Sequence, residues 1–179
     1  MGITTKTGDN GMTSLYLGGR IRKDDIRVDI YGTLDELCSF LGMSKSLIKD
    51  KNIKTLLETI QKDLFILGAE IAAKQGFINR LEKRIDASFV KRLDMTIKTL
   101  ENKRSFEECC FYLPGQSLIS STLDIARTIA RRAERKVVGL KYRHMLKNTQ
   151  ILIYLNRLSD LLYLLARSNE KTHTRLKLD

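Results

Sequence analysis

Apolar residues recur every three or four positions along most of the chain after residue 25, a spacing typical of amphipathic helices. The same spacing predicts helices at about residues 27–49, 53–74, 86–101, 117–140 and 148–169, with Asp86 as the N-cap of the third. Leu113-Pro114-Gly115 predicts a turn before the fourth. The sequence therefore predicts an all-α fold, a five-helix bundle over residues 26–170. The clearest apolar face, in the second helix, consists of Ile53, Leu56, Leu57, Ile60, Leu64, Leu67 and Ile71.

The first 25 residues lack this spacing and alternate hydroxyl residues with glycines. Glycine allows positive φ and hydroxyls compete for backbone hydrogen bonds, so this segment is predicted to be a loop. Its backbone amides, its hydroxyls and Lys6 could cradle a phosphate. The segment lacks the GxxxxGK[ST] spacing of a Walker loop, so a flexible glycine-rich tail is the alternative interpretation.

The predicted fourth helix carries an ordered group of charges beside its apolar stripe. At about 100° per residue, Arg127, Arg131 and Glu134 fall within a wedge of roughly 60°. Arg132 and Arg135 point elsewhere. Guanidinium groups at positions i and i+4 suit a polyanion such as the phosphate tail of a nucleotide.

The predicted fifth helix is apolar over most of its circumference but carries a polar stripe of four residues. Such a stripe needs hydrogen-bond partners, either in a ligand site or across an interface. An internal ladder between Asp160 and Arg167 is the structural alternative, whereas an asparagine in the stripe favours ligand contact. The stripe consists of Asn156, Asp160, Tyr163 and Arg167.

Length and composition fit a single domain over residues 1–179, with 42% hydrophobic residues and a formal charge of +11. The charge suits nucleic acid, nucleotides or an acidic cofactor, or simply a basic solvated surface.

Cys38, Cys109 and Cys110 have no CxxC spacing and suggest neither a zinc site nor a disulfide framework. His144 and His173 are too few for a metal site or a catalytic triad. With no signal peptide and no apolar run of about 18 residues, a cytoplasmic protein without membrane contact is expected.

Two further groups are candidates with ordinary alternatives. The pair Asp35-Glu36 in the predicted first helix is either a solvated face or an acidic partner for one of the surplus arginines. Phe111 and Tyr112 lie just before the predicted turn, where core packing is the default interpretation.

Taken together, these segments resemble the ATP:cob(I)alamin adenosyltransferases of the trimeric, propanediol-utilisation type, from Thr5 to Asn169. Five pieces carry the resemblance in the family's order: TKTGDNGMTSL, KDDIRVDIYGTLDELCSFLG, FYLPG, ARTIARRAERKVV and YLNRLSDLLYLLAR. The resemblance implies a five-helix bundle that assembles into a homotrimer, with active sites between subunits. Residues 1–25 would form a nucleotide-binding loop, and residues 171–179 a polar tail.

The resemblance also implies roles for individual residues. Arg127 would pair with Asp35 across the interface, and Phe111 would occupy the lower axial side of the corrin. ATP would be contacted from one subunit by Thr5, Lys6, Thr7, Gly8, Thr13, Ser14 and Lys23. The neighbouring subunit would contact it through Arg131, Arg132, Glu134, Arg135 and Asn156.

The implied reaction transfers the 5′-deoxyadenosyl group of ATP to cob(I)alamin and releases inorganic triphosphate. The cobalt is itself the nucleophile, so the site needs alignment and charge neutralisation, with Mg²⁺ bound through the ATP phosphates. A cobalamin reductase and an adenosylcobalamin-dependent acceptor enzyme are the implied partners. The alternatives are a non-catalytic ATP- or cobalamin-binding regulator or chaperone, and a basic nucleic-acid-binding bundle, for which no motif is visible.

The chain departs from the family pattern at Cys38, Gln116 and Asp124, where an asparagine, a glycine and a histidine are common in the family. It also has no tryptophan, whereas many relatives carry one near the C-terminus. These departures concern the corrin side of the site more than the ATP side.

Overall fold

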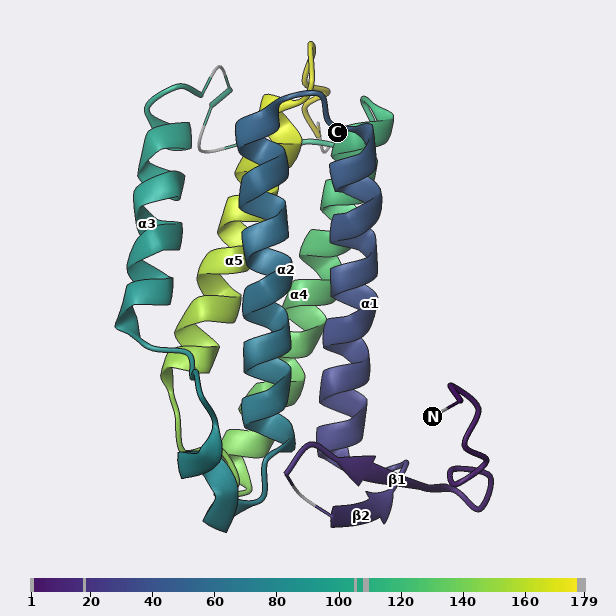
Figure 1. The fold of residues 1–179 in the computed structure, drawn as a ribbon. Helices are drawn as coiled ribbons and strands as arrows, with labels where there is room; N and C mark the ends of the chain where they lie inside the picture. The colour runs from purple at the N-terminus through teal and green to yellow at the C-terminus, as the bar shows by residue number, and fades with distance from the viewer. Residues whose placement is uncertain (1, 18, 105, 108–109, 177–179) are drawn as a thin grey trace.

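The computed structural model describes residues 2–17, 19–104, 106–107 and 110–176, which form a bundle of long helices with a small hairpin at one end. In Figure 1 the helices lie side by side, with α3 at the outer edge next to α5. The helices are α1 (Ile26–Leu47), α2 (Lys51–Ala72), α3 (Ala87–Glu101), α4 (Leu118–Tyr142) and α5 (Gln150–Ser168). The predicted all-α bundle is confirmed.

The helix boundaries follow from capping residues in the sequence. Asp25, Asp50, Asp86 and Ser117 each accept a hydrogen bond from a backbone N–H of the first turn of the helix that follows. Such a bond satisfies one of the amides that a helix start leaves without a partner. The prediction of Asp86 as an N-cap is confirmed, and the five predicted helices begin and end within about two residues of the observed ones.

The core lies where α4 packs against both α1 and α5, while α2 covers α1 and α3 covers α5. Each helix contributes its apolar stripe, so that one leucine from each of the five has no exposed surface: Leu37, Leu67, Leu93, Leu123 and Leu158. Removing such a side chain from a packed core costs about 2–5 kcal/mol. No described helix has the length and apolarity needed to cross a membrane.

The N-terminal segment departs from the loop prediction. Residues Met12–Leu15 (β1) pair antiparallel with Gly19–Arg22 (β2), with Met12 opposite Arg22 and Leu15 opposite Gly19. The side chain of Leu15 is buried, which anchors the hairpin at the foot of α1. The remaining loop, residues 2–11, projects away from the bundle (Figure 1). A short 3₁₀ helix, η1 (Gln75–Arg80), lies in the connection between α2 and α3.

Residues 169–176, which follow α5, lie at the opposite end of the bundle from the hairpin (Figure 1). The backbone N–H of Leu113 donates to the carbonyl of Thr174 at 2.9 Å, and that of Leu176 donates to Phe111 at 2.8 Å. The tail thereby forms a short antiparallel bridge, Tyr112 to Arg175, with the connection between α3 and α4.

Candidate functional site

The arginine face of α4 opens onto a cavity of about 300 Å³. Arg127 and Arg131 line it from α4, while Asp160 and Tyr163 line it from α5. Glu134 accepts a hydrogen bond from Asn156 Nδ2 at 3.2 Å, one turn further along the same two helices. The structure therefore brings together the charged wedge of α4 and most of the polar stripe of α5.

Two side chains of this cavity are partly desolvated, although Asp160 and Arg131 remain exposed to solvent. Burial raises the pKa of the Asp160 carboxyl above its ordinary value, and burial likewise raises the pKa of the Tyr163 hydroxyl. Charges interact more strongly where water is partly excluded. The guanidinium groups of Arg127 and Arg131 would therefore attract an anion in this cavity more strongly than they would on a fully open surface.

A buried ion network supports one wall of the cavity. Asp124 accepts from Arg127 Nε at 2.9 Å and from the guanidinium of Arg167, whose side chain is 1% exposed. Arg167 also pairs with Glu170 at 3.0 Å and stacks over the Tyr163 ring. The predicted alternative of an Asp160–Arg167 ladder is wrong, because Arg167 turns inward to Asp124 instead.

Arg132 points to a different groove, of about 660 Å³, between α1 and α4. There it pairs with Glu36, and Lys136 pairs with Asp29 at 2.6 Å. Lys23, from the segment after the hairpin, also lines this groove. The expectation that the Asp35-Glu36 pair supplies a partner for a surplus arginine is confirmed for Glu36. Sequence reasoning missed Asp29 and Lys136, although Lys136 lies one turn beyond Arg132.

The N-terminal loop is exposed but has a defined shape. Arg20 donates to the carbonyl of Thr7 at 2.6 Å, and Gly8 lies so close to Lys23 that an added Cβ would be 3.1 Å from its amine. Lys6 has a left-handed backbone, with φ of 57°. Positive φ at a residue other than glycine is uncommon and concentrates at functional sites. Among the predicted ATP contacts, Thr13 and Ser14 lie on β1.

The two predicted halves of the ATP site do not meet within one chain. The loop projects beside the foot of α1, and none of the residues 5–14 lines the cavity of Arg127 and Arg131. Asp35 is exposed and makes no ion pair with another described residue, while Arg127 is held by Asp124. Arg135 is exposed on α4 and lines neither groove.

The aromatic residues before α4 have divided roles. Tyr112 packs in a cluster with Phe106 and His173, with ring centroids 5.4–5.9 Å apart, and Phe106 also meets Tyr163. Among the described residues, the hydrophobic core includes neither aromatic: Tyr112 is half-buried in this separate cluster, and Phe111 is 80% exposed, so the core-packing interpretation is wrong for both. Sequence reasoning missed Phe106 and His173, because only the fold brings the tail to this connection.

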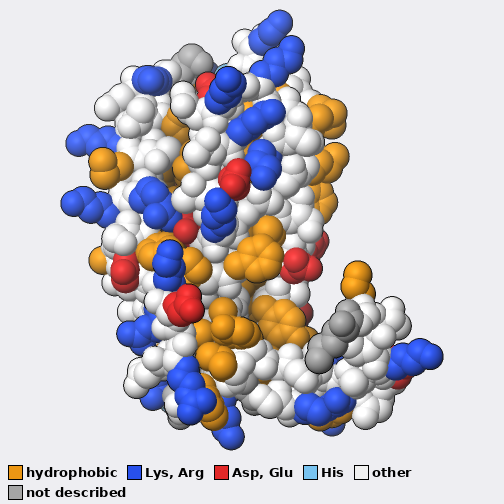
Figure 2. Space-filling model, in the orientation of Figure 1, with side chains coloured by type: hydrophobic (Ala, Val, Ile, Leu, Met, Phe, Trp, Pro, Cys, Tyr) orange, Lys and Arg blue, Asp and Glu red, His pale blue; other side chains and the backbone are white. Residues whose placement is uncertain are grey.

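Lys and Arg side chains are spread over the face drawn in Figure 2, with hydrophobic side chains between them. The positive charge is therefore not gathered there into the continuous basic stripe that a nucleic-acid footprint presents.

Comparison with known proteins gives concordant matches over nearly the whole chain. Residues 3–169 match the family described as cobalamin adenosyltransferase. A corrinoid adenosyltransferase of Citrobacter freundii is 41% identical over 95% of this chain and 96% of its own length. The corrinoid adenosyltransferase of Bacillus subtilis is also 41% identical, over 93% of this chain and 86% of its own. The chain spans half the length of the similar PduO protein of Salmonella typhimurium.

Solved structures agree. A variant of the PduO-type ATP:corrinoid adenosyltransferase of Lactobacillus reuteri, complexed with cobalamin and ATP, superposes with a TM-score of 0.88 at 33% identity. The match covers 99% of this chain and all of that one. A second variant of the same enzyme, complexed with ATP, gives a TM-score of 0.87 over 98% of this chain.

Proposed function

Because this chain belongs to the cobalamin adenosyltransferase family, we infer that it is a transferase that adenosylates a corrinoid at the expense of ATP. The observation that carries this function in the chain itself is the cavity where Arg127 and Arg131 converge beside the polar stripe of α5. Arg131 makes no ion pair with another described residue, so its guanidinium is available to a triphosphate that gains charge as it leaves, while Asp124 holds Arg127 at the rim.

In the proposed reaction the Co(I) centre attacks C5′ of ATP. The electron pair of the metal forms the cobalt–carbon bond, the C5′–oxygen bond breaks, and inorganic triphosphate leaves with the electrons of that bond. The cobalt is thereby oxidised to Co(III). The protein has two tasks, to hold cobalt and C5′ in line and to neutralise the leaving group.

We propose that ATP lies between two subunits of a homotrimer. One subunit contributes the N-terminal loop, with Thr5, Lys6, Thr7, Gly8, Thr13, Ser14 and Lys23. Its neighbour contributes Arg131, Arg132, Glu134, Arg135 and Asn156. The projection of the loop away from its own bundle supports this arrangement, as does Asp35, which is exposed and available to a neighbour's Arg127.

Arg127 then has two acidic partners in the proposal, Asp124 within its chain and Asp35 across the interface. A guanidinium presents five donors, so it can bind both carboxylates at once. Mg²⁺ prefers phosphate oxygens and one or two carboxylates, with several waters retained. We therefore propose that it enters with the triphosphate, and Glu134 is the carboxylate beside these arginines.

Phe111 is proposed to face the corrin. Its ring is exposed at the end of the bundle where the tail closes over the connection before α4. An aromatic ring on the lower axial side excludes a donor ligand, and a cobalt without that ligand is easier to reduce.

A cobalamin reductase and an adenosylcobalamin-dependent acceptor enzyme are the proposed partners, and the cytoplasm is the proposed location.

The test is to incubate the chain with ATP, Mg²⁺ and chemically reduced cobalamin and to follow the absorbance change that accompanies adenosylcobalamin formation. We expect one triphosphate per corrinoid adenosylated. Pyrophosphate or orthophosphate as the only inorganic product would contradict the mechanism. Arg127→Ala is expected to abolish transfer while ATP binding persists, and Lys54→Ala, an exposed change on α2, is the control. Wild-type ATP binding without transfer would favour the regulator or chaperone instead.

A further inference from the structure

Asp124 is a buried carboxylate that two arginines share. Its oxygen Oδ1 accepts from Arg127 Nε at 2.9 Å, and its oxygen Oδ2 accepts from the guanidinium of Arg167. The two arginines lie in different surroundings. Arg127 lines the cavity on α4, whereas the side chain of Arg167 is almost fully enclosed in the interior. One carboxylate therefore connects the interior of the bundle to the rim of the proposed site.

The bond through Nε leaves the outer end of the Arg127 guanidinium unoccupied. Among the residues that the structure describes, Asp124 is the only one to which this side chain donates a hydrogen bond. A guanidinium carries one donor on Nε and four on its two Nη atoms. Two of those Nη donors, side by side, fit the two oxygens of a carboxylate. Asp124 thus fixes the direction of the guanidinium and leaves free the donors that pairing with a neighbour's Asp35 requires.

Arg167 in turn holds Asp124 in place. Arg167 pairs with Glu170 at 3.0 Å, and its guanidinium lies over the Tyr163 ring, 5.3 Å from the centroid. Two arginines and two carboxylates make a network without net charge, and mutual compensation of this kind is what makes buried charges tolerable. Because Arg167 is enclosed, it has no water to turn to, and its bond to Asp124 Oδ2 is the one that persists.

We propose that Asp124 is a positioning residue for the transfer reaction, which holds the Arg127 guanidinium in the direction that the assembled site uses. Asp124 acts through Arg127 and touches neither ATP nor the corrinoid. The role rests on the proposed function, since Arg127 takes part in transfer only there. Small displacements of such a group lower the rate of a reaction that depends on alignment.

The first test is Asp124→Asn. An asparagine has one acceptor oxygen where aspartate has two. The enclosed Arg167 takes that oxygen, so Arg127 loses its bond and its fixed direction. Below the midpoint of thermal unfolding of the variant, we expect kcat for transfer to fall about tenfold, the effect of one lost hydrogen bond to a charged group. ATP affinity, measured by equilibrium binding, stays unchanged, because Arg127 is not among the proposed ATP contacts.

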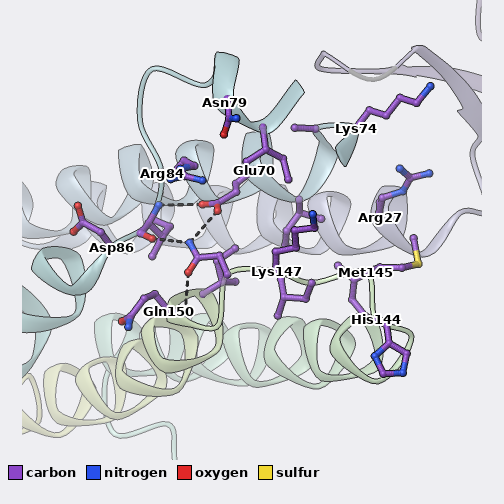
Figure 3. Close-up of a pocket in the computed structure, with 18 of the residues that line it drawn as sticks. Arg27, Glu70, Lys74, Asn79, Arg84, Asp86, His144, Met145, Lys147 and Gln150 are labelled. Atoms are coloured by element: carbon purple, nitrogen blue, oxygen red, sulfur yellow. Dashed lines mark hydrogen bonds between the residues drawn. The ribbon is translucent and has the colours of Figure 1, made fainter. Parts of the chain in front are cut away.

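Glu70 offers a matched control in a separate cavity, of about 890 Å³, at the hairpin end of the bundle (Figure 3). It is also buried, and its two oxygens also accept from two donors, the backbone N–H of Ile85 at 3.0 Å and Asn148 Nδ2 at 2.9 Å. This cavity shares no lining residue with the cavity of Arg127. Glu70→Gln therefore removes the same charge and the same kind of acceptor, and we expect it to lower stability while kcat stays unchanged.

A second comparison separates positioning from a loss of stability. Arg167→Met/Glu170→Gln removes the competing arginine together with its balancing charge, an exchange that buried ion pairs often tolerate. Adding Asp124→Asn to that background leaves the single oxygen to Arg127, so we expect kcat to fall by less than about threefold. A purely structural role predicts that Asp124→Asn costs as much kcat in this background as in the wild type.

Three results would overturn the positioning role while the proposed function stands. They are a wild-type kcat in folded Asp124→Asn, an equal loss of kcat in Glu70→Gln, and a tenfold loss when Asp124→Asn is added to the Arg167→Met/Glu170→Gln background. The last result decides the matter even where Asp124→Asn alone does not fold. A wild-type chain that binds ATP without transfer would instead overturn the proposed function, and the positioning role with it.

Discussion

Asp124 is the residue on which two arginines of the bundle depend. It holds Arg127 at the rim of the cavity and Arg167 in the interior, where the guanidinium is almost fully enclosed. We expect Asp124→Asn to lower the free energy of unfolding by about 3 kcal/mol, because a buried charge loses most of its compensation. Urea unfolding measures it. Asp94→Asn, which breaks an exposed pair with Arg157, is the control and should cost under about 1 kcal/mol. Equal losses in the two variants would show that Asp124 is not special.

For single residues, the sequence predicts which helix face a side chain lies on better than it predicts the side chain's ion-pair partner. Helical phase alone places Arg127 and Arg131 together, and the structure agrees, since both line one cavity. Phase cannot tell that Arg167 turns to Asp124 rather than to Asp160, because the choice depends on how α4 and α5 cross. A partner 43 residues away is fixed by packing, and no local pattern carries it.

At the scale of elements, long amphipathic helices were predictable because fifteen or more residues repeat one signal and a capping residue marks the start. The hairpin was not, since four-residue strands flanked by glycine and threonine give no periodicity to read. The bridge between Tyr112 and Arg175 could not be predicted either, because it joins the segment before α4 to the segment after α5, which are far apart in sequence.

The start of α1 makes a prediction with a definite pH dependence. Asp25 binds the Arg27 side chain at 3.0 Å and also accepts from the backbone N–H of Arg27 at 2.9 Å, and these bonds lower the pKa of its carboxyl. We expect Asp25→Ala to cost about 1–2 kcal/mol near pH 7. A depressed folded-state pKa stabilises the protein above the unfolded pKa of about 3.9 and loses that effect as pH falls through the folded value.

Chemical unfolding at a series of pH values measures the gap between wild type and Asp25→Ala, which should narrow below about pH 4. Asp25→Asn keeps a good N-cap without the charge, so its loss near pH 7 should be smaller, and it should also narrow below about pH 4 because only the wild-type residue titrates. A gap for the alanine variant that stays constant down to pH 2 would contradict the assignment.

The tail is expected to matter for the corrinoid and not for ATP. His173 packs against both Phe106 and Tyr112, which ties the tail to the segment that presents Phe111. Each lost ring contact costs about 1 kcal/mol, which loosens the segment that presents Phe111. His173→Ala should therefore raise the KM for the corrinoid about tenfold. ATP affinity, measured by equilibrium binding, should stay unchanged. Thr172→Ala, an exposed neighbour, is the control, and a matching loss of ATP affinity in His173→Ala would refute a role confined to the tail.

At the scale of the whole molecule, the proposed site is incomplete in one chain. The loop with Lys6 and the face with Arg131 belong to different regions of the bundle (Figure 1), and the sequence alone gives no distance between them. Hydrophobic spacing specifies which side chains enter the core of a chain. It does not say which exposed groups, such as Asp35, serve a second copy.

Mixing variants decides whether two chains share one site. We expect Lys6→Ala, in the loop, and Arg131→Ala, on α4, each to lose most transfer activity alone. In a cyclic trimer refolded from an equal mixture, random assembly leaves about one interface in four with both halves intact, so about a quarter of the wild-type rate should return. Mixing Lys6→Ala with Thr7→Ala, both in the loop, is the matched control and should restore nothing. If ATP lies wholly within one chain, the Lys6→Ala and Arg131→Ala mixture stays as inactive as its components, because no assembled chain then carries an intact site.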